Sequence, residues 1–212
     1  MLWVVKRLNR EVISMVPTDF SPQEAYRLFL SVVVPRPIAW VSTLGADGTP
    51  NLAPFSFFNG VAGNPLTLLL SVGRRAGGPK DTLRNATETR EMVIHLVTPD
   101  TVRAMNVTSG EYSYGVNEIE KAGLTAVPSV DVKPPRVAEA AVAMECKVSQ
   151  IVPVEGTGST LILGRVVRFH IREDLLRPDH TVDAAKLQPV ARLSGDEYAS
   201  FGEVFHLRRP VV

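Results

Sequence analysis

Residues able to hold a phosphate group gather near predicted strand and helix ends. Ser42-Thr43 closes one predicted strand, Asn51 and Ser56 lie on its hairpin partner, and Lys80-Asp81-Thr82 opens a helix after a glycine-rich loop. A bound phosphate needs a cation, hydroxyl donors and free backbone N–H groups, which this set supplies if the fold brings it together. The plainer alternative is that these residues only end strands, cap the helix and carry a solvated charge.

The segment 51–58 has a proline where a strand is expected. Pro54 has no N–H to donate to a β-ladder, so the strand lies at a sheet edge or is bulged at that point. Either arrangement leaves nearby backbone groups without strand partners. A planar heterocycle with donors and acceptors along one edge would take up those groups, and Trp40 and the phenylalanines of 55–58 would supply apolar surface. Alternatively, these aromatic residues are ordinary core residues.

Generic nucleotide and metal motifs are absent or incomplete. Residues 73–80 look like a P-loop, but Pro79 precedes the lysine and Asp81 stands where a metal-binding hydroxyl is needed. Residues 156–161 lack the third glycine of a dinucleotide fingerprint and lie between two predicted strands, which indicates a hairpin turn. The histidines have no metal-ligand spacing, and no Gly-x-Ser-x-Gly elbow occurs. The sequence therefore predicts neither a metal site nor a catalytic dyad.

Local signals outline an antiparallel β-barrel decorated by short helices. Ser21-Pro22-Gln23-Glu24 combines an N-cap hydroxyl, a first-turn proline and a capping-box glutamate, which predicts that a helix begins there. Gly45-Ala46-Asp47-Gly48 contains the Asp-Gly step typical of a hairpin. Many strands with turn signals between them, and few helices, favour an antiparallel barrel over a parallel α/β sheet. The expected strands are 38–44, 51–58, 67–72, 92–97, 141–154 and 160–172, and the expected helical segments are 21–30, 80–88, 98–106 and 117–122.

Composition and charge narrow the class of protein. The 212 residues are 45% hydrophobic and 21% charged, which is typical of a globular chain and predicts one domain, residues 1–212. The formal charge of +1 gives no reason to expect nucleic acid or an anionic membrane as a partner. Cys146 is the only cysteine, so no intrachain disulfide can form, and we expect it to be a small packed residue. Because we find neither a signal peptide nor a membrane-spanning stretch, we expect a cytoplasmic protein.

Three motifs occur together in the order seen in a known family. They are Pro35-Arg36-Pro37-Ile38-Ala39-Trp40-Val41-Ser42-Thr43, then Asn51-Leu52-Ala53-Pro54-Phe55-Ser56-Phe57-Phe58-Asn59, then Lys80-Asp81-Thr82 with a following Glu88-Thr89. Together they closely resemble the flavin reductase-like family of FMN-binding split-barrel proteins, which includes flavoredoxins. The resemblance covers about residues 18–210, and we take this range as the core of the domain.

The resemblance implies a mainly β fold, a six-stranded antiparallel Greek-key split β-barrel with peripheral short helices. It also implies a homodimer with one FMN per subunit close to the dimer interface. The strand 51–56 would contact the ring system and ribityl chain, while Ser42, Thr43, Lys80 and Thr82 would meet the phosphate. Trp40 shares a strand face with Ser42 and would therefore lie near the flavin edge. The full set of implied cofactor residues is Trp40, Ser42, Thr43, Asn51, Ala53, Pro54, Phe55, Ser56, Lys80, Asp81 and Thr82.

Two residues depart from the family pattern. Ser194 replaces what is usually a first glycine before Gly195, and His95 occupies a position commonly held by asparagine. The serine leaves the resemblance intact. The histidine would change the dimer interface or the surroundings of the flavin.

The function implied is that of an FMN-binding oxidoreductase. We expect it to take a hydride from NAD(P)H onto flavin and to pass electrons onward, with a partner monooxygenase as one possible acceptor. The chemistry then belongs to the cofactor, so no catalytic side chain is required. The alternatives are a flavoredoxin-like electron carrier and an FMN-binding protein without turnover. Arg74 and Arg75 are either a 2′-phosphate site that selects NADPH or plain solvated charges.

Overall fold

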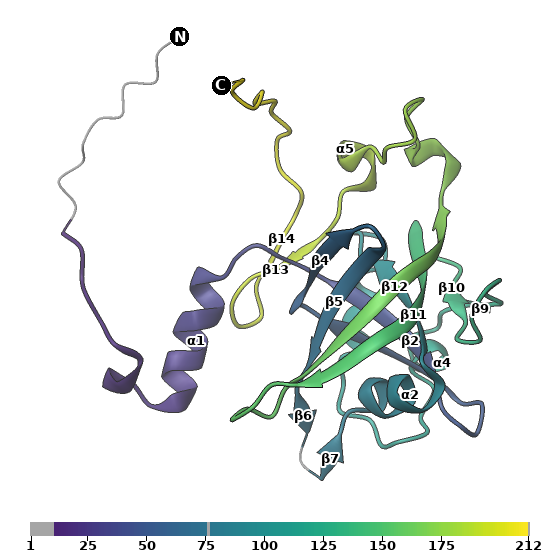
Figure 1. Cartoon of the computed structure of the whole chain (residues 1–212), viewed down its shortest axis with the longest axis horizontal. Helices are drawn as coiled ribbons and strands as arrows, with labels where there is room; N and C mark the ends of the chain where they lie inside the picture. Colours follow the sequence, from purple (N-terminus) through teal and green to yellow (C-terminus); the bar gives the residue numbers. More distant parts are fainter. Residues whose placement is uncertain (1–10, 76, 212) are drawn as a thin grey trace.

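A computed structural model describes residues 11–75 and 77–211, and its framework is one large antiparallel sheet (Figure 1). The strand order is β3-β2-β8-β11-β12-β5-β4. The sheet has seven strands where six were expected, because the predicted strand 51–58 ends at Phe55 and a further strand, Phe58–Gly63, was missed. The Greek-key connectivity stays a prediction. The strands of this sheet are β2 (Ala39–Leu44), β3 (Pro50–Phe55), β4 (Phe58–Gly63), β5 (Leu66–Val72), β8 (Glu91–Leu96), β11 (Val142–Pro153) and β12 (Thr160–Ile171).

The sheet must curl because its two edge strands are neighbours in the chain. β3 and β4 lie at opposite ends of the strand order, yet only Ser56-Phe57 separates them. The residues Ser56-Phe57 form a corner between the two edge strands. The Ser71 N–H on β5 donates to the Phe57 carbonyl at 2.9 Å, which holds this corner against the end of the sheet opposite β3. The result is a barrel that is split beside β3, whose outer backbone edge is covered by no strand of residues 11–75 and 77–211.

The inner face of the curled sheet forms the main hydrophobic core. β2 alternates as its period of two requires: Ala39 and Val41 face this core, while Ile38 and Trp40 join a second cluster on the outer face. Cys146 on β11 is fully buried in the main core. Burial raises the pKa of its thiol to about 12, so the thiolate needed for reactivity is scarce at neutral pH. The expectation of a small packed residue is confirmed.

The second cluster is covered by the segment that follows β8. Met105 of α3 (Val102–Val107) and Ile119 of α4 (Glu118–Lys121) pack on it with Trp40 and Leu52. Helix α3 begins later than expected because Thr98 and Thr101 first form a hydrogen-bonded turn. This covering segment forms one wall of the site described below.

The remaining elements surround the sheet, and no helix of the described residues is both long and apolar enough to cross a membrane. Helix α1 (Pro22–Val32) begins at Ser21 with the expected capping box, and it has no buried residue. In Figure 1 it projects away from the barrel. The other elements are η1 (Pro17–Asp19), β1 (Arg36–Pro37), β6 (Arg74–Arg75), β7 (Gly78–Pro79), α2 (Asp81–Thr89), β9 (Ala126–Val127), β10 (Arg136–Val137), η2 (Glu173–Leu175), α5 (Ala184–Leu187), β13 (Ala191–Arg192) and β14 (Tyr198–Ala199).

Candidate functional site

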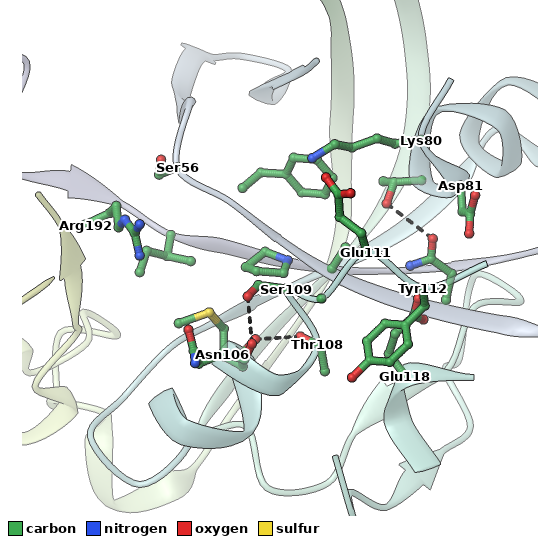
Figure 2. A pocket seen from close by; sticks show the side chains of 18 of the residues that line it. Ser56, Lys80, Asp81, Asn106, Thr108, Ser109, Glu111, Tyr112, Glu118 and Arg192 are labelled. Atoms are coloured by element: carbon green, nitrogen blue, oxygen red, sulfur yellow. Dashed lines mark hydrogen bonds between the residues drawn. The ribbon is translucent and has the colours of Figure 1, made fainter. Parts of the chain in front are cut away.

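A cavity of about 390 Å³ lies along the uncovered edge of β3. Its volume is in the range usual for small-molecule sites. The start of α2, the loop after α3 and the β13–β14 turn supply its other walls, and Figure 2 shows their side chains converging on it. Its lining residues are Ile38, Asn51, Ala53, Pro54, Phe55, Ser56, Arg75, Lys80, Asp81, Thr82, Met105, Asn106, Thr108, Ser109, Gly110, Glu111, Tyr112, Glu118, Arg192, Asp196 and Tyr198.

The edge position of β3 explains how one strand offers so many groups to the cavity. Its residues 53–55 and the following Ser56 line the cavity consecutively, which a strand buried between two others could not do. The Leu52 N–H donates to Glu118 Oε2 at 2.9 Å and so points away from β2. By the alternation along a strand, the nitrogen of Pro54 also points away from β2, and the proline removes no ladder bond. The prediction that Pro54 marks a sheet edge or bulge is confirmed as an edge.

Asn51 presents an unpaired donor at this cavity. Its side chain is 5% exposed, the Thr82 hydroxyl donates to its Oδ1 at 3.5 Å, and its Nδ2 has no partner among the described residues. A buried amide group left without a hydrogen bond is costly, of the order of 1–3 kcal/mol. A ligand with acceptor oxygens along its edge would supply the missing partner.

Two carboxyl groups stand at the same end of the cavity. Asp81 opens α2 and forms an ion pair with Arg75, with Oδ1 and Nη2 2.8 Å apart. Glu118 comes from α4 and is buried, which raises the pKa of its carboxyl group even though the Leu52 N–H favours the charged form. Arg75 also donates to the Tyr112 carbonyl at 3.0 Å and thereby fixes the loop after α3 against the mouth of the cavity.

Two further cations border the cavity. The Lys80 ammonium lies 5.6 Å from the centre of the Phe55 ring, and Lys80 is exposed, so its charge remains available to a ligand. The Arg192 guanidinium stacks on Tyr198 at 4.4 Å and donates to the Gly195 carbonyl. Figure 2 shows Lys80 and Arg192 on opposite sides of the cavity.

The structure brings eight of the eleven implied cofactor residues together and leaves three apart. Trp40, Ser42 and Thr43 are fully buried and do not line the cavity. Trp40 and Ser42 do share a strand face, but that face is covered by the segment after β8. The eight residues that line the cavity are Asn51, Ala53, Pro54, Phe55, Ser56, Lys80, Asp81 and Thr82.

Hydrogen bonds within the protein occupy the polar atoms of those three residues. Trp40 Nε1 donates to Thr108 Oγ1 at 2.8 Å, and Ser42 Oγ donates to the Pro135 carbonyl at 2.5 Å. Thr43 Oγ1 accepts from Asn85 Nδ2 at 3.1 Å. In this arrangement they support the walls of the site, and a phosphate would meet neither hydroxyl.

His95 also lies away from the cavity and joins two segments. Its ring is fully buried, Nδ1 donates to the Trp40 carbonyl at 2.9 Å, and Nε2 accepts from the Val137 N–H at 3.0 Å. Burial lowers the pKa of His95 to about 4, so the neutral ring is the form present at neutral pH. His95, one of the two residues that depart from the family pattern, therefore supports the outer face of the sheet and does not line the cavity.

Several lining residues were missed in the sequence. Arg75 was considered only with Arg74, as a 2′-phosphate site or as a solvated charge, whereas it pairs with Asp81 at the cavity. Arg192 had no spacing that set it apart from a solvated charge, and Glu118 lies in a segment expected to be irregular apart from one helical turn. The capping signal of Asn117 does place Glu118 at a helix start, and Asn117 accepts from the Ile119 N–H at 3.1 Å. The contact of that helix with β3 is long-range and left no local signal.

The chain belongs to the family of flavin reductase-like domains, whose model matches residues 31–187. Three solved structures show the likeness along most of the chain. Nitrilotriacetate monooxygenase component B from Bacillus cereus is 39% identical with a TM-score of 0.90, and the match covers 93% of this chain and 100% of that one. The 2-nitrobenzoate 2-nitroreductase NbaA of Pseudomonas fluorescens is 28% identical with a TM-score of 0.85, covering 93% and 96%. The flavoredoxin of Desulfovibrio vulgaris is 25% identical with a TM-score of 0.72, covering 82% and 91%.

Proposed function

We propose that this protein is an FMN-binding oxidoreductase, most specifically an NAD(P)H-dependent flavin reductase. The observation that carries the proposal is the cavity along the open edge of β3, with the unpaired Nδ2 of buried Asn51 on its wall. Bound FMN would accept a hydride from a nicotinamide nucleotide and release electrons to an acceptor. The protein would bind and orient the ring system and limit the access of water.

The donors and acceptors of the cavity match the chemistry of FMN. Asn51 offers a donor to a ring oxygen or a ribityl hydroxyl, and the small side chain of Ala53 permits close approach of a flat ring. Asp81 and Glu118 offer acceptors to ribityl hydroxyls or to a ring N–H. Lys80 and Arg192 supply the cations that a phosphate requires. The resemblance assigned four residues to the phosphate. Of these, Lys80 and Thr82 line the cavity and keep that role, whereas Ser42 and Thr43 do not.

Stopped-flow reduction separates the reductase from its alternatives. The flavin-loaded protein is mixed anaerobically with NADH or NADPH while the visible flavin absorption is followed. Rapid loss of this absorption with either nucleotide is the expected result. Loss only with a reduced protein donor would instead indicate a flavoredoxin-like carrier, and no loss with any donor would indicate a binding protein without turnover.

We also propose a homodimer, because the exposed side chains of α1 and its flanks include many large apolar groups. Tyr26, Phe29, Val32 and Val33 are between 41% and 67% exposed. A contiguous apolar surface of this kind is typical of an interface. Light scattering is expected to give twice the chain mass of 23.1 kDa, and a value near 23.1 kDa would contradict the dimer.

The electron acceptor we propose is a monooxygenase component, on the ground that the B. cereus protein carries the name of such a component. We place the protein in the cytoplasm because its one cysteine is a buried, unpaired thiol. Consumption of the nicotinamide nucleotide is expected to rise when a cognate monooxygenase and its substrate are added.

A further inference from the structure

One carboxyl group on the cavity wall has surroundings that favour its neutral form. Glu118 is 5% exposed and reaches the cavity from the start of α4. Its Oε2 accepts the Leu52 N–H at 2.9 Å, and its Oε1 forms no hydrogen bond with residues 11–75 and 77–211. A buried carboxylate is normally stabilised by a cation or by several N–H donors. Glu118 therefore lacks much of what an ionised form requires.

The charged groups around Glu118 do not give it a cation of its own. The Arg75 guanidinium acts on it only from a distance, because it pairs with Asp81 at 2.8 Å and donates to the Tyr112 carbonyl at 3.0 Å. The carboxyl group of Asp81 opposes a second negative charge at this end of the cavity. Glu111, from the loop after α3, lines the same cavity and adds another carboxyl group. The two other charged residues of α4 are exposed.

The balance of these effects favours a protonated acid. Burial is the main cause that raises the pKa of Glu118 above the ordinary value of 4.5, and the charge of Asp81 raises it further. The N–H groups of Leu52 and of Glu118 itself, and the charge of Arg75, act in the opposite direction. A neutral carboxyl group has one acceptor oxygen and one hydroxyl. Because Oε2 accepts from Leu52, the hydroxyl is at Oε1, the oxygen without a partner.

A second unpaired group adjoins Glu118. Asn51 directly precedes Leu52 on β3, and its buried Nδ2 donates to no described residue, Glu118 included. Both side chains line the cavity. One end of the cavity thus offers an amide donor and a hydroxyl donor that the protein itself leaves unused.

We propose that Glu118 is protonated when the site binds its ligand and that Oε1–H donates to the ligand alongside Asn51 Nδ2. The ligand then has two neighbouring acceptors on one edge, such as a carbonyl oxygen next to an imine nitrogen. The pyrimidine ring of a flavin has such an edge, and in this respect the inference rests on the proposed function and deepens it. Asp81, which is paired with Arg75, remains an acceptor, so the two carboxyl groups have different roles.

The proposal requires that binding depend on pH in one direction. Below the raised pKa of Glu118 the acid is neutral and donates to the ligand. As the pH rises through that pKa the proton is lost, and the carboxylate repels the same acceptor atoms. A purely structural role, as acceptor for the Leu52 N–H, predicts the opposite trend, because a carboxylate accepts more strongly than a neutral acid.

Flavin binding measured against pH tests the proposal with Glu118→Gln and a matched control. Glutamine keeps an acceptor for the Leu52 N–H and a donor for the ligand, and it does not ionise. Glu88→Gln removes a carboxyl group from the exposed face of α2. The FMN affinity of both variants and of the unchanged chain is measured by flavin fluorescence from about pH 5 to about pH 9, and circular dichroism checks the fold at each pH. The phosphate of FMN titrates equally in all three experiments, so its effect cancels.

Between those pH values, FMN binding to the unchanged protein is expected to weaken about tenfold more than binding to Glu118→Gln, the loss typical of one hydrogen bond and a gained charge. Glu88→Gln is expected to follow the unchanged protein. At about pH 5, Glu118→Gln is expected to bind FMN as tightly as the unchanged protein, within about twofold. The donor role is refuted if all three proteins show the same pH dependence, or if Glu118→Gln binds FMN weakly at every pH.

Failure of the proposed function gives a different result, because FMN then binds none of the three proteins at any pH. The side-chain carboxyl signal of Glu118 in carbon-13 NMR, identified by its absence from Glu118→Gln, still decides whether the proton is present. Titration of this signal well above pH 4.5 supports the protonated acid, and titration at or below that value refutes it.

Discussion

Replacing His95 with asparagine is expected to remove a large part of the acid sensitivity of this fold. The buried imidazole is neutral in the native state, since burial lowers its pKa from 6.5 to about 4. The unfolded chain regains the ordinary pKa and therefore binds a proton more readily. Stability is fully present above a pH of about 6.5 and is lost as the pH falls toward about 4.

The size of the effect follows from the difference between the two pKa values. One pKa unit corresponds to about 1.4 kcal/mol, so the difference amounts to about 3 kcal/mol in full. Lowering the pH from about 7 to about 5 reduces the free energy of unfolding by about 2 kcal/mol through this residue. Asparagine keeps at most one of the two hydrogen bonds, so the variant also loses about 1–3 kcal/mol at neutral pH.

Urea unfolding at both pH values measures this difference. The free energy of unfolding of the unchanged protein is expected to fall by about 2 kcal/mol more than that of His95→Asn. Other titrating groups contribute equally to both proteins and cancel in the comparison. His206→Asn, in the exposed C-terminal segment, is the control and is expected to follow the unchanged protein. Equal losses for His95→Asn and the unchanged protein would refute the assignment of a neutral, buried ring.

Two substitutions and one labelling experiment test the site and the core. Ala53→Val is expected to lower flavin occupancy by obstructing the ring, with a stability loss of about 1–3 kcal/mol from overpacking, as measured by flavin content and urea unfolding. Lys80→Ala is expected to weaken FMN binding about tenfold while riboflavin binding barely changes, and equal losses for both would place Lys80 away from the phosphate. Cys146 is expected to resist a thiol reagent in the native state and to react after denaturation, because its thiol is buried with a pKa of about 12.

Much of the fold could be predicted from the sequence because its local signals agree with the tertiary structure. The capping box at Ser21, the Asp-Gly hairpin at 47–48 and the long hairpin of β11 and β12 all lie where expected. Pro54 indicated an edge strand because it cannot donate to a ladder, and that edge is where the cavity lies. The end of β3 at Phe55 and the strand Phe58–Gly63 were missed, because the apolar residues continue through a corner that tertiary contacts impose.

The site was only partly predictable, because burial decides which polar residues are available. Alternation correctly placed Trp40 and Ser42 on one face of β2, but it could not show that the segment after β8 covers that face. Arg36 and Arg192 are far apart in the chain, and their pairing exists only after β1 and β13 meet. Long-range contacts of this kind leave no periodic pattern in the sequence.

A crystal structure of the protein grown with FMN tests the central claim most directly. The ring system is expected in the cavity along β3, within hydrogen-bonding distance of Asn51 Nδ2 and beside Ala53. The assignment of this cavity as a flavin site is wrong if FMN occupies a different part of the molecule. It is also wrong if the protein binds no flavin even in a large excess of FMN.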